Sequence, residues 1–100
     1  MPVSARSMKY LLGWLIAGSR GGPMRAKIIE VLRETPQNAN QLATLFDADY
    51  KTIRHHIDVL DKNRIVTSMG DGYATTYFLS SEMEENYVLF EDIRKKMWKK

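Results

Sequence analysis

The feature that most constrains this chain is a change of hydrophobic periodicity near residue 64. Before it, apolar side chains recur at three- and four-residue steps, the spacing of one face of an α-helix. After it, residues 65–68 and 74–79 are rich in β-branched and aromatic side chains and flank Gly70-Asp71-Gly72, a pattern typical of a β-hairpin. A chain of 100 residues holds one compact domain. The sequence therefore predicts a single domain over residues 1–100, mainly α with a small β-hairpin.

Two helices are predicted before residue 36. The first, residues 4–18 with Ser4 as its cap, carries a stripe of apolar residues and ends in a glycine-rich segment. Pro23 suits the first turn of the next helix. That helix stops before Pro36, because the residue preceding a proline avoids the helical region.

A pair of helices joined by a tight turn follows. Asn38 and Gln41 have the spacing of a capping box, which predicts a short helix. We expect its apolar residues to face the core: Leu42, Leu45 and Phe46. Asp49 ends the turn and is expected to cap a longer helix, residues 50–63, whose apolar positions again recur at helical spacing.

A last helix is predicted over residues 81–99, because Ser81 and Glu84 have capping-box spacing and apolar residues recur along the segment. The predicted order is helix, helix, helix–turn–helix, hairpin and helix. Two helices joined by a tight turn and followed at once by a hairpin, here residues 65–79, form the arrangement of a winged helix–turn–helix domain.

Four stretches carry a family resemblance: Asn38-Ala39-Asn40-Gln41-Leu42-Ala43, residues 49–60, Lys62-Asn63-Arg64-Ile65-Val66, and the hairpin from Gly70-Asp71-Gly72 to Tyr77-Phe78-Leu79. With them, residues 22–79 resemble the winged helix–turn–helix transcription regulators of the ArsR-like type, particularly the compact versions common in archaea. The resemblance implies a regulator that binds double-stranded DNA, with the helix 50–63 in the major groove and the wing against neighbouring phosphate or minor groove.

The sequence departs from that family in two places. The metal-sensing branch carries a cysteine motif on the recognition helix, and this chain has no cysteine, so a thiolate metal sensor is excluded. Arg64 stands where the family usually has glycine. It strains the turn and adds a candidate phosphate contact.

One face of the helix 50–63 has the chemistry of a DNA-reading surface once that fold surrounds it. Arg54 can bind a guanine edge in bidentate fashion, and Lys51 can bind guanine or phosphate. The predicted DNA contacts are Asn40, Tyr50, Lys51, Thr52, Arg54, His55, Arg64, Tyr73 and Thr75. The alternatives are that this face is an ordinary solvated helix surface and that Tyr73 only covers the core.

Asp58 and the two histidines each have more than one interpretation. Asp58 can accept from cytosine or pair with Arg54, and the i, i+4 spacing favours the pair. His55 and His56 point about 100° apart on a helix, so they cannot chelate one metal together. His56 is expected to pack or hydrogen-bond at the core edge. His55 and Asp58 can supply two ligands, but nothing obvious completes a metal site, so none is predicted.

The terminal helices carry a larger apolar surface than one small core is expected to cover. Exposed patches beyond a few hundred Å² are unusual on monomers, so we expect a homodimer in which terminal helices pair. Two-fold symmetry would place the recognition helices roughly 34 Å apart, one turn of DNA. The predicted interface is Met8, Leu11, Leu12, Trp14, Leu15, Tyr87, Phe90, Ile93, Met97 and Trp98. The alternative is that both helices fold over their own core.

Composition excludes several other classes. The apolar run 10–17 is shorter than the roughly 20 residues of a membrane span and lacks a signal-cleavage pattern. The absence of cysteine fits a reducing cytoplasm, where we expect the protein to reside. The sequence offers no glycine-rich phosphate loop, activated nucleophile or paired carboxylates, so neither catalysis nor a cofactor is predicted.

The charge distribution leaves a second function class open. The net charge of +3 comes from bases near both ends, whereas residues 33–92 are net acidic. Basic ends suit a polyanion, but the acidic middle also suits a winged-helix module that binds proteins and not DNA. Salt dependence would separate the two, because DNA binding weakens steeply as salt rises. The sequence does not say whether a small-molecule effector exists.

Overall fold

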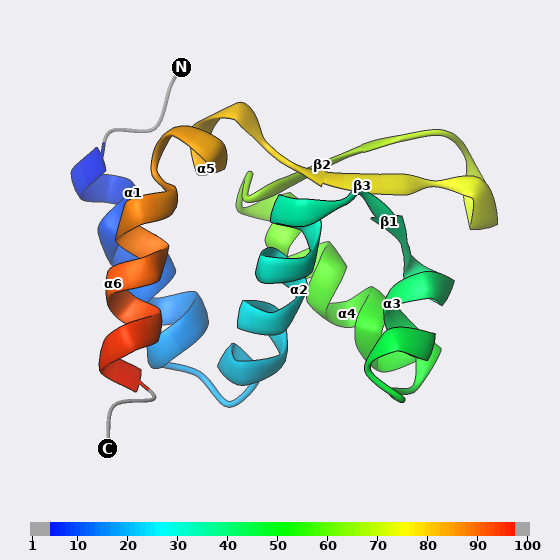
Figure 1. Ribbon diagram of the computed structural model, residues 1–100, viewed down its shortest axis with the longest axis horizontal. Helices are drawn as coiled ribbons and strands as arrows, with labels where there is room; N and C mark the ends of the chain where they lie inside the picture. The colour runs from blue at the N-terminus through cyan, green and yellow to red at the C-terminus, as the bar shows by residue number, and fades with distance from the viewer. Residues whose placement is uncertain (1–4, 98–100) are drawn as a thin grey trace.

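The helices lie in two groups, with a small sheet along one side (Figure 1). The structure, a computed structural model, describes residues 5–97. Its elements in chain order are α1 (Ala5–Leu12), the π-helical turn η1 (Gly13–Ala17), α2 (Gly22–Glu34), β1 (Gln37–Asn38), α3 (Ala39–Leu45), α4 (Tyr50–Lys62), β2 (Val66–Met69), the 3₁₀ turn η2 (Gly72–Ala74), β3 (Thr76–Leu79), α5 (Ser81–Glu85) and α6 (Tyr87–Met97). The mainly helical fold with a small antiparallel sheet confirms the predicted class.

The N-terminal helix changes its hydrogen bonding halfway along. After α1 the chain continues as η1, and the N–H of Gly18 donates to the carbonyl of Gly13 at 2.9 Å, the i→i−5 pattern of a π-helix. The α2 helix then begins very close to η1. A Cβ at Gly22 would lie 1.7 Å from the carbonyl oxygen of Ile16, so only glycine allows this approach. The predicted cap Ser4 lies outside the described residues.

The two helices around the turn are capped as predicted. The Asn38 side chain accepts from the N–H of Gln41 at 2.7 Å, and the Gln41 side chain accepts from the N–H of Asn38 at 2.8 Å. Asp49 caps α4. The prediction for Leu45 is wrong, because this side chain is 58% exposed on the outer face of α3.

The sheet contains a strand that the sequence did not predict. Within the described residues its order is β1-β3-β2, with Gln37 opposite Tyr77 and Thr67 opposite Phe78, both pairs antiparallel. Only two residues form β1, directly before the capping box of α3. So short a segment carries no alternation of its own, and its pairing comes from the position of β3.

The C-terminal segment is broken into two helices at Asn86, where one helix was predicted. The predicted cap Ser81 is wrong, because Ser80 has the extended backbone of an N-cap and its hydroxyl accepts from the N–H of Met83 at 3.1 Å. The same hydroxyl donates to the carbonyl of Arg64 at 2.7 Å, which ties the start of α5 to the exit from α4.

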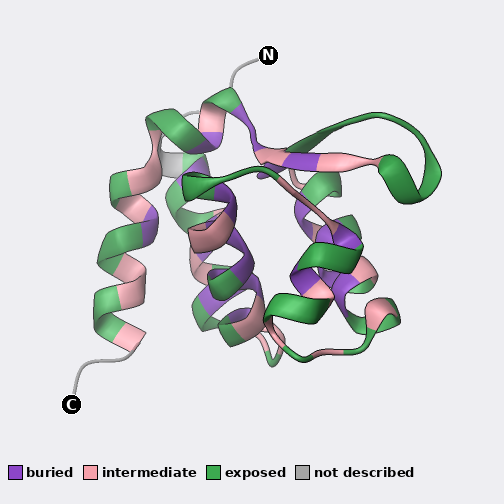
Figure 2. Cartoon of the chain, turned by 45° about the vertical axis from the view of Figure 1, so that its right-hand side comes forward, coloured by how far each residue is buried: buried purple, intermediate pink, exposed green. Residues whose placement is uncertain are grey.

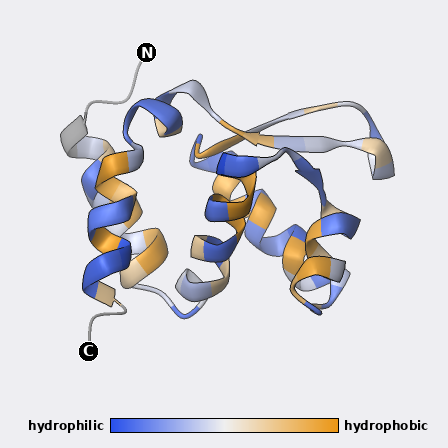
Figure 3. Cartoon of the chain, viewed as in Figure 1, coloured by the Kyte–Doolittle hydropathy of each residue, from blue (hydrophilic) through white to orange (hydrophobic). Residues whose placement is uncertain are grey.

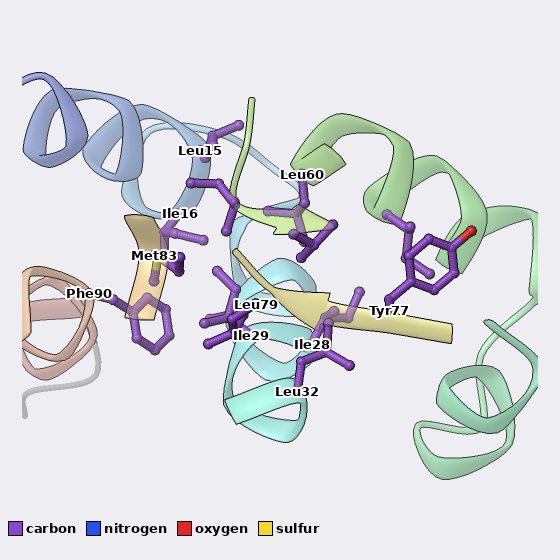
Figure 4. Close-up of a cluster of buried hydrophobic side chains, with 14 of the residues drawn as sticks. Leu15, Ile16, Ile28, Ile29, Leu32, Leu60, Tyr77, Leu79, Met83 and Phe90 are labelled. Carbon is purple, nitrogen blue, oxygen red and sulfur yellow. The ribbon is translucent and has the colours of Figure 1, made fainter. Parts of the chain in front are cut away.

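The core extends into the terminal helices, which corrects part of the predicted dimer interface. Met8, Leu12, Leu15 and Phe90 are at most 1% exposed within the single chain. Phe90 lies beside Ile16 and Met83 in the cluster of Figure 4. These four residues are therefore covered by their own chain and are not available to a partner.

The α6 helix is held on α2 by polar contacts as well. The Arg94 guanidinium forms an ion pair with Glu30, with Nη2 donating to Oε1 at 2.9 Å. The Arg33 guanidinium lies 3.9 Å from the centre of the Tyr87 ring, a cation–π contact. Figure 2 shows buried positions on the inner side of these helices and exposed ones outside, and Figure 3 shows the same division in hydropathy. In residues 5–97 no helix is long and apolar enough to span a membrane.

Candidate nucleic-acid interface

The α4 helix presents one buried and one open side. Ile53, Ile57 and Leu60 are fully buried, which fixes the helix against the core. Three predicted contact residues, Lys51, Thr52 and His55, are exposed on the other side. The sequence prediction that this side is left uncovered therefore agrees with the structure for these three residues.

The cap of α4 uses two of the backbone donors at its N-terminus. The Asp49 carboxylate accepts from the N–H of Lys51 at 3.1 Å and from the N–H of Thr52 at 3.3 Å. These donors are no longer available to a phosphate. The side chains of Lys51 and Thr52 stay exposed on this turn and are available to a ligand.

The tip of the wing closes over the start of α4. The rings of Tyr50 and Tyr73 lie 6.0 Å apart between centroids at 46°, within the range of an aromatic pair. Together with Arg54 and Gly72 they line an open hollow of about 360 Å³. The structure thus brings together Tyr50, Arg54 and Tyr73 of the predicted set, and Gly72, which was predicted as part of the hairpin turn and not as a DNA contact.

Arg54 is partly enclosed in this corner. Its Nη2 lies 3.4 Å from Asp58 Oδ1, which confirms the predicted i, i+4 pair. A hydrogen bond with Tyr50, and then the influence of Tyr77 and Asp58, raise the pKa of the guanidinium above its ordinary value, so it stays cationic. Its Nε is buried and has no hydrogen-bond partner among the described residues. Leaving a buried donor unpaired costs free energy.

Of the other predicted contacts, Asn40 and Arg64 lie apart from this corner, whereas Thr75 adjoins it, because its N–H donates to the carbonyl of Gly72 at 3.2 Å. Asn40 is exposed on α3 and lines a separate hollow of about 440 Å³ with Gln37, Gln41 and Leu45. Arg64 follows the far end of α4, about 20 Å along the helix at 1.5 Å per residue. Its φ of 61° is the left-handed conformation that the usual glycine would adopt easily. Thr75 is half-buried where η2 leads into β3.

Sequence reasoning missed a buried polar pair behind the recognition helix. His56, expected to pack or hydrogen-bond at the core edge, is 8% exposed and accepts from Arg25 on α2. Arg25 is one of the bases near the N-terminal end, and no structural role was predicted for it. The available signal was its spacing from Ile28, Ile29 and Leu32, which places a charged residue on the buried face of α2.

The histidines do not form a metal site in the described part of the chain. Residues 5–97 contain no group of three or more histidine, cysteine, aspartate or glutamate side chains arranged to hold a metal ion. His55 and Asp58, the pair considered from the sequence, therefore have no third ligand of these types beside them there.

A short helix, a tight turn, a capped second helix with an open polar side and a β-wing define a winged helix–turn–helix domain. Residues 16–84 match the family model described as "Methanogenesis regulatory protein FilR1, N-terminal domain". The chain belongs to this family. A comparison with curated protein sequences found no match.

Solved structures share the fold at low sequence identity. A probable transcriptional regulator from Pseudomonas aeruginosa is 24% identical with a TM-score of 0.62, covering 93% of this chain and 76% of that one. HlyU from Vibrio cholerae is 14% identical with a TM-score of 0.67, covering 98% and 100%. The homodimeric winged helix–turn–helix DNA-binding domain of Mb0332 from Mycobacterium bovis, a possible ArsR-family transcriptional regulator, is 14% identical with a TM-score of 0.65, covering 92% and 83%. These likenesses confirm the predicted fold.

Proposed function

We propose that the chain is a transcription regulator that binds double-stranded DNA as a homodimer, with α4 in the major groove. The observation that carries the proposal is the uncovered polar side of α4, where Lys51, Thr52 and His55 are exposed beside the wing. The major groove admits an α-helix and displays base edges that such side chains can reach. The family description and the names of the similar structures, which are regulators, support the same function.

Arg54 is the residue we expect to read a base. In the absence of DNA its guanidinium is held along the helix by Asp58 and leaves Nε unpaired. A guanine offers two acceptors to an arginine fork in the major groove. Moving Arg54 out of its corner therefore gives up the ion pair with Asp58 and the hydrogen bond with Tyr50, frees the buried Nε, and gains two charge-assisted hydrogen bonds to the base.

The wing contributes shape and hydroxyl groups but little charge. The only charged side chain in residues 66–79 is Asp71, which repels phosphate. Tyr73 and Thr75 carry hydroxyls that can donate to phosphate oxygens. Positive charge near the groove is thus concentrated on α4 and its ends, so we expect these residues to account for most of the salt dependence of DNA binding, with each neutralised phosphate contributing about 0.9 to the log–log slope.

The second copy is proposed to pack on the outer face of the N-terminal helix. Tyr10 is 67% exposed and Trp14 is 61% exposed, one helical turn apart, and Leu11 beside them is half-buried. Burying two exposed aromatic side chains removes a large apolar area from water. The similar domain of Mb0332 is described as homodimeric, which supports this assembly.

The remaining predicted interface residues differ in how far they are available to a second copy. Ile93 and Met97 are half-buried on α6 and stay candidates for the edge of the interface. Tyr87 is half-buried and already packs on Arg33 and Phe90 within the chain. Trp98 lies outside the described residues.

The proposal is tested by selecting bound duplexes from a random-sequence pool and measuring affinity over a salt series. We expect Lys51→Ala to lower the log–log slope by about 0.9 per protomer. Arg54→Ala should cost about 1–3 kcal/mol for the selected sequence and little for random duplex, because it removes a base contact. Lys95→Ala, an exposed lysine on α6, is the matched control and should change neither.

The alternative of a protein-binding module makes the opposite prediction. In that case no duplex is enriched, or the retained DNA is released equally by all three variants. Either result would contradict the proposed function.

A further inference from the structure

Arg25 and His56 form a buried polar pair between α2 and α4. Their residues are 5% and 8% exposed, so both are withdrawn from solvent. Arg25 Nη1 lies 3.2 Å from His56 Nδ1. The pair stands directly behind the proposed DNA-reading side, because His56 follows the exposed His55 on the same helix.

Arg25 connects three parts of the chain through one guanidinium. Its Nε and Nη2 donate to the carbonyl oxygen of Leu15 at 3.0 and 2.9 Å, and Nη2 also donates to the Ser19 hydroxyl. Leu15 belongs to η1 and Ser19 to the turn that follows it. The position of α4 is thus tied, through Arg25, to the N-terminal segment proposed to form the dimer.

The backbone at Gly21 closes one side of this pair. A Cβ at this position would lie 2.5 Å from Arg25 Nη1 and 2.6 Å from His56 Cε1. Any larger residue would displace the two side chains. The close approach of the glycine is one reason that the pair is shielded from water.

The hydrogen bond determines the protonation state of His56. A guanidinium has donors and no acceptor, so Nδ1 must accept and the imidazole must be neutral with its proton on Nε2. Burial, then Arg25, then His55 lower the pKa of His56 below its ordinary value. The charged groups acting on it, Arg25 from α2 and His55 from α4, are both basic, and the Ser19 hydroxyl and Leu15 carbonyl around Arg25 are neutral.

We propose that Arg25 and His56 are positioning residues that hold the recognition helix in place relative to the N-terminal segment, and that protonation of His56 on mild acidification releases this hold. A protonated His56 loses its acceptor and places a second cation against the guanidinium. The effect on DNA binding rests on the proposed function, whereas the effect on folding does not.

The direction of the pH effect on stability follows from the lowered pKa. Below the ordinary histidine value of about 6.5, the unfolded chain binds a proton at this position that the folded chain resists. The stability contributed by the neutral pair is therefore fully present above that value and is lost as the pH falls. His55, which is exposed, lacks this burial and serves as an internal comparison.

The test measures thermal unfolding at pH 7.5 and 5.5 for the wild type, His56→Asn and His55→Asn. Asparagine keeps an oxygen that can accept from Arg25 but does not titrate in this range. We expect the melting temperatures of wild type and His55→Asn to fall further on acidification than that of His56→Asn, because only the first two proteins keep the buried histidine. Equal losses in all three proteins would overturn the proposal.

A second measurement uses only folded wild-type protein and remains decisive if His56→Asn does not fold. NMR titration of the His56 imidazole should show the Nε2–H tautomer and a midpoint below the ordinary histidine value of about 6.5. A His56 midpoint at or above that value would overturn the proposal.

The DNA arm is carried out in the His55→Asn background, because protonated His55 would itself attract phosphate. At constant salt, the selected duplex should bind several-fold more weakly at pH 5.5 than at pH 7.5, and adding His56→Asn should remove most of that difference. An unchanged pH ratio in the double variant would contradict the positioning role. Absence of binding at both pH values would instead contradict the proposed function, and the unfolding and NMR results would still test the pair.

Discussion

Contacts of single side chains hold both ends of α4 in place. At the start, Asp49 caps the helix and Arg54 is held by Asp58. At the end, Arg64 has a left-handed backbone, and its carbonyl accepts from the Ser80 hydroxyl. Ser80 thus joins the recognition helix to the C-terminal helices, although nothing in the local sequence distinguishes it from Ser81.

Ser80 and Ser81 are expected to contribute unequally to the free energy of unfolding. Ser80→Ala should lower the free energy of unfolding by about 1–2 kcal/mol, because it removes an N-cap and leaves the Arg64 carbonyl without this donor. Ser81→Ala, at an exposed position, should change it by less than about 0.5 kcal/mol. Denaturant unfolding of both variants provides the measurement. Equal losses would show that the cap has been assigned to the wrong residue.

At the scale of helices and strands, predictions succeeded where the signal is local and failed where distant contacts decide. The capping box of α3 and the cap of α4 involve residues three positions apart or fewer, so the sequence contains the whole interaction. The two-residue strand β1 is defined by its pairing with β3. The break between α5 and α6 at Asn86 contains no glycine or proline, so the sequence did not predict it. The π-helical turn likewise lies in an apolar run that reads as ordinary helix.

The candidate site residues follow the same division. The exposure of Lys51, Thr52 and His55 was predictable, because helical spacing separates them from the buried residues of α4. The contact between Tyr50 and Tyr73 depends on how the wing folds back, and the Arg25–His56 pair depends on the packing of α2 against α4. Such contacts between distant segments are not encoded in any local pattern.

At the scale of the whole molecule, the proposed functions fall at opposite ends of the chain's fold. The helices α1 and α6 lie at one end, and α3, α4 and the wing tip lie at the other (Figure 1). Much of the apolar surface predicted for a dimer interface is instead buried in the core of the single chain, as for Leu12 and Phe90. What remains outside on the N-terminal helix is centred on Tyr10 and Trp14.

This division predicts that dimerisation can be removed without unfolding the chain. Trp14→Ser should shift the protein toward monomer, because the side chain is 61% exposed and contributes little to its own core. Met69→Ser, which removes a side chain 70% exposed on the wing strand, should leave the assembly unchanged. Sedimentation equilibrium over a concentration series measures both. A dimer equally stable in the two variants would place the interface elsewhere.

Chemical-shift mapping would detect directly whether the open side of α4 occupies a DNA groove, as proposed. Isotope-labelled protein would be titrated with the selected duplex while the backbone amide signals are followed. We expect the largest shifts along Tyr50–Lys62 and in residues 70–75 at the wing tip, with the signals of α6 changing little. Bound DNA that shifts the signals of α6 and leaves those of α4 in place would contradict the proposal.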